Sequence, residues 1–392
     1  MSSDLPVPET RVLAIASHVV YGYVGNTMAT FVMQSLGCEV AALNTVHFSN
    51  HTGYRQVKGT KSTAQEIYAL YDGLRQSDLT DFDVLLSGYA PSAAAVEAVG
   101  LIATDLKKRA EKKPGSFFWV LDPVMGDQGR IYVNEDVIPA YMRLIPHADL
   151  ILPNQFEAEL LSGVKITSFS NLADAIDVIH RTLHVPHIIV TSVHLPDPVS
   201  SSSSSVVSFS TADNSTNSQD SRSNTLAVVG STMRSDGSPR LFRIDVPQLD
   251  CFFSGTGDMF AALTVARLRE AIYVADSANT SATPRLHETP SWVSPDDVPP
   301  TELPLAKAAE MVLASMHCVL EKTLIARNEE LAKYKNEDTS MAFQDLPEAD
   351  QKAALEKRAH LRQTKAAEIR LVRNVNLLKN PTVRFRAEEF VL

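Results

Sequence analysis

Short apolar runs alternate with amphipathic stretches along the first half of the chain. The stretches at 27–37 and 93–113 have apolar residues at helical spacing, and the first of them stops at Gly37. The alternation is typical of βαβ units and predicts an α/β fold, a doubly wound, mainly parallel sheet with helices on both faces. The strands are expected within residues 11–16, 39–46, 83–89, 117–124, 149–154 and 187–193.

The pattern changes after the last of these runs. Residues 196–224 are rich in serine and include six consecutive serines, so they offer too little apolar surface to offset the entropy of ordering and predict a disordered loop insertion. The runs at 225–234 and 240–248 alternate apolar and polar residues around the sequence SDGSP, which predicts a hairpin of edge strands.

Two more polar stretches interrupt the second half of the chain. Residues 276–302 are rich in Ser, Thr and Pro, and residues 326–366 are highly charged with a helical bias. Because large α/β folds often reach this length as one unit, we expect these insertions to decorate a single domain, residues 11–392. A short disordered tail, residues 1–10, is expected to precede it.

Charge and composition exclude several classes of partner. With 36 basic and 46 acidic residues the net charge is −10, a field that repels nucleic acid and anionic lipid. No apolar run approaches the roughly 18 residues of a membrane-spanning helix. Three widely spaced cysteines without a CxxC pair fit a reducing compartment. Together with a polar start that does not read as a secretory signal, they predict a cytoplasmic protein, with the nucleus left open.

The sequence SGTGDMFAALTVARL, residues 254–268, places glycines directly before a predicted helix. Such glycines let backbone N–H groups turn toward a ligand, and a helix N-terminus favours a phosphate group, so Gly255, Thr256 and Gly257 predict an anion hole. Asp258 would only complement the helix dipole if the motif stood alone. Beside a phosphate cradle, its carboxylate is a candidate base for a substrate hydroxyl.

Two other acidic motifs follow predicted strands. In LDPVMGD, residues 121–127, Asp122 and Asp127 are candidate Mg²⁺ ligands, or residues that cap the turn. In PNQFEAELLSG, residues 153–163, Asn154 and Glu157 have the spacing of a capping box. The functional alternative for this pair is that Glu157 orients a hydrated Mg²⁺ and Asn154 contacts phosphate or metal-bound water.

Two polar segments near the N-terminus are candidates for the substrate pocket. SHVVYGYVGN, residues 17–26, matches neither GxxxxGK[ST] nor GxGxxG and could be a flexible connection. NTVHFSNHTGY, residues 44–54, concentrates Asn, Ser, Thr, His and Tyr, which favours a polar lid over a ring-bearing substrate.

Taken in order, these segments, together with LSGY, IIVTS and FSGTGDMFAA, resemble the pyridoxal kinases of the ribokinase superfamily. The resemblance covers most of residues 11–270 and extends more weakly to the helix around 304–325 and the C-terminal tail. SNHTGY and PNQFEAELLSG are its more specific parts, whereas GTGD occurs throughout the superfamily. It implies a ribokinase-like fold with a small lid.

The resemblance also implies roles for individual residues. Asp258 looks like the general base and also touches the substrate, and the residues before it look like the anion hole, with Thr256 also at the nucleotide. Tyr132 resembles a lid residue near the nucleotide, although the loop QGRIY after Asp127 is shorter than the lid of some related enzymes. Substrate contacts are expected from Ser17, Thr52 and Tyr89; ATP contacts from Asp122, Asn154, Glu157, Thr191 and Ser192; and metal contacts from Asp122, Asp127 and Glu157.

The implied activity is ATP-dependent phosphorylation of the 5′-hydroxymethyl group of pyridoxal, pyridoxine and pyridoxamine in vitamin B6 salvage. The resemblance further implies a need for Mg²⁺ or another divalent metal, assistance by K⁺, and a homodimer. Two alternatives stay open. One is a kinase of the hydroxymethylpyrimidine type, which shares the fold but typically has GTGC in place of GTGD. The other is a catalytically silent paralogue that binds the vitamer.

Overall fold

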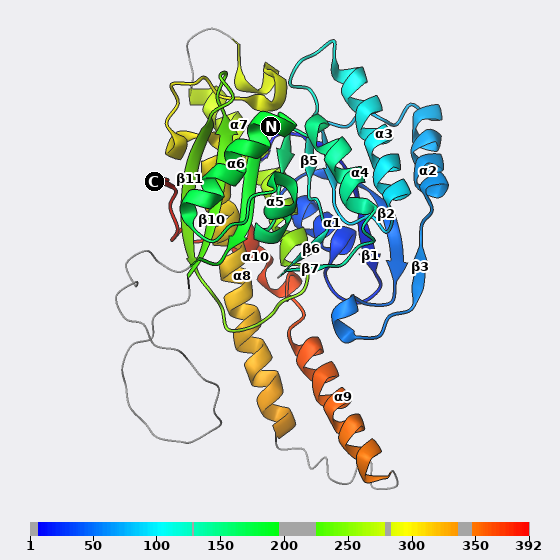
Figure 1. The fold of residues 1–392 in the computed structure, drawn as a ribbon. Coiled ribbons are helices and arrows are strands. Elements are labelled where there is room, and N and C mark those ends of the chain that lie inside the picture. Colours follow the sequence, from blue (N-terminus) through cyan, green and yellow to red (C-terminus); the bar gives the residue numbers. More distant parts are fainter. Residues whose placement is uncertain (1–6, 128, 196–224, 279–283, 336–346, 392) are drawn as a thin grey trace.

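The apolar runs form one sheet whose central strands are all parallel (Figure 1). The computed structural model describes residues 7–127, 129–195, 225–278, 284–335 and 347–391, so the Ser-rich stretch 196–224 lies outside the described residues. Across the centre the strand order is β9-β8-β5-β4-β1-β2, with each pair parallel. The bounds of these strands are β1 (Arg11–Val19), β2 (Glu39–Phe48), β4 (Val84–Ser87), β5 (Phe118–Leu121), β8 (Leu150–Ile151) and β9 (His187–Val193).

Antiparallel strands extend the sheet at both edges. On one side β3 (Gly59–Lys61) pairs with β2. On the other side β10 (Thr225–Met233) pairs with both β9 and β11 (Pro239–Pro247), which confirms the predicted hairpin. The two-residue strand β12 (Glu388–Glu389), near the C-terminus, pairs with β11 and closes that edge.

Helices cover both faces of the sheet because successive strand residues point to opposite sides. In β1, Val12 and Ala14 belong to the core on one face, and Leu13 and Ile15 belong to the core on the other. This arrangement confirms the predicted doubly wound α/β fold. The first face carries α1 (Gly25–Ser35), α7 (Thr256–Ala278) and α8 (Pro304–Lys335); the second carries α2 (Ala64–Gln76), α3 (Ala93–Ala110), α4 (Val137–Leu144), α5 (Gln155–Ser162) and α6 (Phe169–Leu183).

The charged stretch 326–366 contains the end of α8 and the whole of α9 (Glu348–Ala366), in agreement with its helical bias. The two helices lie side by side and project beyond the sheet as a helical arm (Figure 1). Near the body, Arg370 forms an ion pair of 2.6 Å with Glu330. Further along the arm, the Arg362 guanidinium lies 4.3 Å from the centroid of the Tyr334 ring. After the arm the chain returns to the body through α10 (Val375–Lys379). None of the helices in the described ranges is long and apolar enough to cross a membrane.

The stretch 276–302 differs from the expected surface decoration. Helix α7 continues to Ala278, and in the described part from 284 onward Trp292 is only 3% exposed. Its ring stacks on Phe118 of β5 with centroids 4.1 Å apart, and its Nε1 donates to the Gly115 carbonyl at 2.8 Å. One aromatic residue in a polar stretch gives no periodic signal, yet the burial of Trp292 ties the described part of this segment to the core.

Candidate active site

The predicted site residues lie at the carboxyl ends of neighbouring parallel strands, where ligands bind in open α/β sheets. Strand β1 changes register against β2 between Ala16 and Ser17, so Ser17 follows a bulge at the strand end. The backbone N–H of Thr191 donates to the Pro153 carbonyl at 3.0 Å, which brings the end of β9 beside the start of α5. The same edge carries Tyr89 after β4, Asp122 after β5, Asn154 after β8, and Ser192 in β9.

Asp258 lies in the first turn of α7, where the N-terminus of α1 also meets it. The N–H of Gly25, the first residue of α1, donates to the Asp258 carboxylate. Burial raises the pKa of Asp258 to about 6, and the bond from Gly25 opposes that shift. A carboxylate with a pKa in this range is ionised at neutral pH and is a stronger base than an exposed aspartate.

The loops before α1 and α7 are pressed together around Asp258. Gly255 has φ +84°, and a Cβ added there would lie 2.2 Å from the Tyr23 carbonyl oxygen. Gly25 has φ +53°, and a Cβ added there would lie 2.2 Å from the Ser17 Oγ. Only glycine fits either position without a backbone shift. The approach places the Ser17 hydroxyl directly against the residue that holds Asp258.

The Asp122 carboxylate lies close to the predicted anion hole. Its Oδ2 lies 4.0 Å from the position that a Cβ of Gly257 would occupy. Burial, and then the charges of Glu157 and Asp258, raise the pKa of Asp122 well above its usual range. The carboxylates of Glu157 and Asp258 therefore both disfavour the ionisation of Asp122, a setting that a cation would stabilise.

Glu157 forms the predicted capping box with Asn154, and the box also holds the neighbouring loop. The backbone N–H of Glu157 donates to the Asn154 Oδ1 at 2.9 Å, and that of Asn154 donates back to Oε2 at 2.9 Å. Oε1 of Glu157 accepts from the N–H of Met125 at 2.8 Å and of Gly126 at 3.3 Å. Burial raises the pKa of Glu157 to about 7 against these bonds. The motif forms the capping box, and this does not conflict with a role for the same residues in the candidate site.

The loop after Asp122 is a small two-stranded hairpin, β6 (Gly126–Asp127) with β7 (Arg130–Ile131). The Asn154 Nδ2 donates to the Gly126 carbonyl at 2.7 Å and fixes the hairpin to the start of α5. Tyr132 follows β7 and is 63% exposed. Burial, and then the charges of Asp127 and Glu157, raise the pKa of Tyr132.

The predicted lid forms a short 3₁₀ turn, η1 (Thr52–Tyr54), over the start of α7. A Cβ added at Gly53 would lie 3.3 Å from the Ser254 Oγ, which places Thr52 beside the glycines of the anion hole. Tyr89 is half-buried, and its carbonyl accepts from the Thr45 Oγ1 at 2.7 Å. The structure thus brings Ser17, the Thr52 turn and Asp258 together, with Asp122 across from them.

Mg²⁺ commonly binds one or two carboxylates together with substrate phosphates. Asp122, which faces the start of α7, fits that pattern, whereas both oxygens of Glu157 already accept backbone N–H groups. In the part of the chain that the structure describes, no group of three or more His, Cys, Asp or Glu side chains could hold a metal ion by itself.

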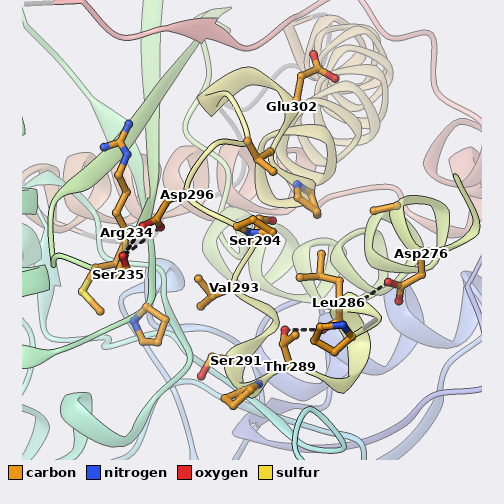
Figure 2. Close-up of a pocket in the computed structure, with 18 residues that line it drawn as sticks. Arg234, Ser235, Asp276, Leu286, Thr289, Ser291, Val293, Ser294, Asp296 and Glu302 are labelled. Atoms are coloured by element: carbon orange, nitrogen blue, oxygen red, sulfur yellow. Dashed lines mark hydrogen bonds between the residues drawn. The ribbon is translucent and has the colours of Figure 1, made fainter. Parts of the chain in front are cut away.

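A cavity of about 930 Å³ lies elsewhere, between the end of β10 and residues 284–304 (Figure 2). None of the predicted site residues lines it. Its two aspartates form hydrogen bonds with other residues of the cavity wall. The Asp276 carboxylate accepts from the N–H of Leu286 and from His287, and the Asp296 carboxylate accepts from the N–H of Ser235. This cavity is thus not where the phosphate-binding features gather.

Comparison with known proteins identifies the family. A putative pyridoxal kinase of Schizosaccharomyces pombe is 35% identical over 313 residues, 80% of this chain and 85% of that protein. The chain belongs to the pyridoxal kinase family. The human pyridoxal kinase is 39% identical to this chain over 267 residues, which are 66% of this chain and 77% of the human protein. The phosphomethylpyrimidine kinase family model matches residues 88–233.

Solved structures of pyridoxal kinases have the same fold. The Leishmania donovani enzyme in complex with ADP and pyridoxamine is 25% identical, with a TM-score of 0.67 over 97% of this chain and all of that one. The complex of the same enzyme with ADP and pyridoxine matches at the same identity and TM-score, over 97% of this chain and 99% of that one. This likeness confirms the ribokinase-like fold predicted from the motifs.

Sequence reasoning missed several contributors to the site of this pyridoxal kinase family member. Gly25 was visible as a glycine before a helix, but its bond to Asp258 required the fold. Tyr141 of α4 is buried near Asp122, Glu157 and Tyr89, which with burial raise its pKa, and it lies in a segment without a motif. Glu368, described below, follows the charged stretch and gave no signal.

Proposed function

We propose that this member of the pyridoxal kinase family transfers the γ-phosphoryl group of ATP to the 5′-hydroxymethyl group of pyridoxal, pyridoxine and pyridoxamine. Family membership supports the proposal, as do the relatives solved with ADP and a vitamer. The observation that carries it is the setting of Asp258. Its carboxylate is held by the start of α1, lies at the start of α7, and has a pKa raised to about 6.

In this proposal Asp258 accepts the proton of the vitamer hydroxyl as that oxygen attacks the γ-phosphorus of ATP. The N–H groups at the start of α7 stabilise the charge on the transferring phosphoryl group, as preorganised donors do in oxyanion holes. Ser17, Thr52 and Tyr89 form the wall that orients the vitamer ring. The Gly25 N–H keeps the Asp258 carboxylate aimed at the junction of the two helices.

The nucleotide is proposed to lie on the other side of Asp258, against Asn154, Thr191 and Ser192, with Tyr132 at the rim. Asp122 would hold Mg²⁺ together with the phosphates, and Asp127 and Glu157 would orient the water molecules around it. Bound Mg²⁺ would neutralise phosphate charge. Assistance by K⁺, a homodimer and a cytoplasmic location follow from the resemblance and remain predictions; assays in K⁺ against Na⁺ salts and sedimentation test the first two.

The test is a coupled assay of ADP release with ATP, Mg²⁺ and a panel of acceptors. We expect kcat/KM to be higher for at least one of pyridoxal, pyridoxine and pyridoxamine than for hydroxymethylpyrimidine. The reverse order would assign the chain to the pyrimidine alternative. Release of ADP at background level with every acceptor, from protein that still binds pyridoxal, would instead identify a silent vitamer-binding paralogue.

One observation bears on the choice between the two kinase activities. The phosphomethylpyrimidine kinase model matches residues 88–233 and so includes neither the SNHTGY segment nor the GTGD motif. Those two segments meet in the structure, since Gly53 lies against Ser254. The part of the site that faces the acceptor is therefore built from the residues that resemble pyridoxal kinases, which favours the vitamer.

A further inference from the structure

The carboxylate of Glu368, just beyond the end of α9, joins two loops that border the proposed vitamer pocket. Its Oε1 accepts from the Tyr54 hydroxyl at 2.8 Å and lies 3.1 Å from the His51 Nε2. Its Oε2 lies 2.6 Å from the position that a Cβ of Gly22 would occupy. Gly22 precedes α1, Tyr54 belongs to the Thr52 turn (η1) and His51 is the N-cap of that turn, so one side chain contacts both walls.

The chemistry of the contact fixes the orientation of both donors. The Gly53 N–H donates to the His51 Nδ1 at 3.2 Å, so the proton of the neutral imidazole is on Nε2 and points at Glu368. Burial and Glu368 raise the pKa of Tyr54, which keeps its hydroxyl protonated as a donor. The His51 and Glu368 side chains are only 9% and 15% exposed, so little solvent competes for these bonds.

The helical arm contacts the same turn at a second point. The His360 Nε2, on α9, lies 2.9 Å from the Gly53 carbonyl oxygen, where it is placed to donate. The ion pair between Arg370 and Glu330 fastens the base of α9 to α8 without reaching the turn. The position of the Thr52 turn is therefore set from the C-terminal part of the chain.

We propose that Glu368 is a positioning residue for the vitamer: it holds the Thr52 turn against the loop before α1 in the shape that receives the acceptor ring. The inference rests on the proposed function, because it takes the Thr52 turn as a wall of the vitamer pocket. Glu368 acts through His51 and Tyr54 and takes no part in proton transfer. Its loss should therefore weaken vitamer binding while the nucleotide side of the site is unaffected.

Steady-state kinetics of Glu368→Ala and Glu368→Gln test the proposal. We expect Glu368→Ala to raise the KM for pyridoxal about tenfold, the effect of losing hydrogen bonds to a charged acceptor, with the KM for ATP within about twofold of wild type. Glu368→Gln keeps an acceptor of the same shape, so its pyridoxal KM should fall between those of wild type and Glu368→Ala. Equal effects on both KM values would overturn the proposal.

Glu330→Gln is the matched control, since it breaks the ion pair at the base of the arm and leaves the turn contacts in place. We expect its pyridoxal KM to stay within about twofold of wild type. If it raises KM as much as Glu368→Ala does, the arm acts only as general support and the specific role is lost. The double variant Tyr54→Phe/Glu368→Ala should be no worse than Glu368→Ala, because both changes remove the same hydrogen bond.

Hydrogen–deuterium exchange separates this inference from the proposed activity. Backbone amides of residues 49–56 should exchange faster in Glu368→Ala and Glu368→Gln than in wild type, and at the wild-type rate in Glu330→Gln. This result is expected even if no acceptor is phosphorylated, in which case the activity fails and the positioning contact stands. Unchanged exchange in both Glu368 variants would overturn the contact whatever the kinetics show.

Discussion

The Asp258 carboxylate takes a hydrogen bond from the Gly25 N–H at the meeting point of two helix N-termini. Replacing it by Asn keeps the size of the side chain and removes the proton acceptor. We expect Asp258→Asn to lower kcat by about 10²–10⁴, the usual contribution of a general base, and to leave ATP affinity within a few fold. Single-turnover kinetics and nucleotide titration measure the two effects. Near-wild-type turnover would remove Asp258 from the base role.

Although Asp258→Asn should lower activity, it is expected to increase stability. The folded-state pKa of Asp258, about 6, lies above its ordinary value of 3.8, so the fold favours the protonated form. That contribution to stability is present below about pH 4 and is lost as the pH rises through about 6. At pH 7.5, Asp258→Asn should therefore raise the free energy of unfolding, by on the order of 2 kcal/mol.

Urea denaturation of both proteins at pH 7.5 and pH 4.5 measures this gain. The advantage of Asp258→Asn should shrink at the lower pH, where the wild-type carboxyl is largely protonated in the folded protein. An advantage of equal size at both pH values would show that the charge of Asp258 is not its cause.

Gly25 is the second residue on which the site depends. Because a Cβ there would lie 2.1 Å from the Ser17 carbonyl oxygen at a φ of +53°, Gly25→Ala must shift the start of α1. We expect the free energy of unfolding to fall by about 1–3 kcal/mol and kcat to fall at least about tenfold, since the N–H moves away from Asp258.

Gly73→Ala is the control for this change. Gly73 lies inside α2, and a Cβ added there meets nothing within 4 Å. Alanine favours a helix by about 1 kcal/mol over glycine, so this variant should keep full activity and be at least as stable as wild type. Chemical denaturation and the ADP assay apply to both; equal behaviour of the two variants would contradict the role given to Gly25.

The local motifs of the candidate site were predictable from the sequence. Gly255 to Asp258 precede a helix, and Asn154 with Glu157 form a capping box, both readable from spacing. The contact between His51 and Glu368 joins residues 317 positions apart, and no local pattern encodes such a pairing. The Gly25 bond likewise depends on how α1 packs beside α7.

At the scale of elements, the strands were predictable where apolar residues are consecutive, and the hairpin where they alternate. The two-residue strands β6 and β7 are too short to produce either pattern. The stretch 276–302 was expected to decorate the surface because its composition is polar. The burial of Trp292 against Phe118 is a tertiary contact, and tertiary contacts override local composition.

This contact predicts that the stretch contributes to stability. Trp292→Ala removes a buried ring that stacks on β5, so we expect a loss of about 3–5 kcal/mol in the free energy of unfolding, measured by urea denaturation. Leu101→Ala is the control, because Leu101 on α3 is 62% exposed and its truncation should cost less than about 0.5 kcal/mol. A small loss of unfolding free energy in Trp292→Ala would show that the stretch contributes little to stability.

For the molecule as a whole, two buried histidines link the sheet to a helix and to the segment that contains Ser291. His180 of α6 lies 2.9 Å from the Ser231 Oγ of β10, and His187 of β9 lies 2.7 Å from the Ser291 carbonyl oxygen. Burial lowers the pKa of each histidine to about 4. Because the unfolded chain protonates near pH 6.5, their contribution to stability is present above that pH and is lost as the pH falls from 6.5 toward 4.

Asp258 and Glu157 have the opposite effect on stability between pH 6.5 and 4. The fold raises their pKa values to about 6 and 7, so their contribution to stability increases as the pH falls. The unfolding free energy of the wild-type protein should therefore change little in mild acid, because the two effects oppose each other. Removing one carboxylate should reveal the loss of stability caused by the histidines. We expect the unfolding free energy of Asp258→Asn to fall more steeply between pH 6.5 and 5 than that of wild type. Adding His180→Gln should lower that slope by up to about 1.4 kcal/mol per pH unit, the value of one proton. Urea denaturation across this range measures the slopes, and a slope unaffected by His180→Gln would show that other groups govern the acid response.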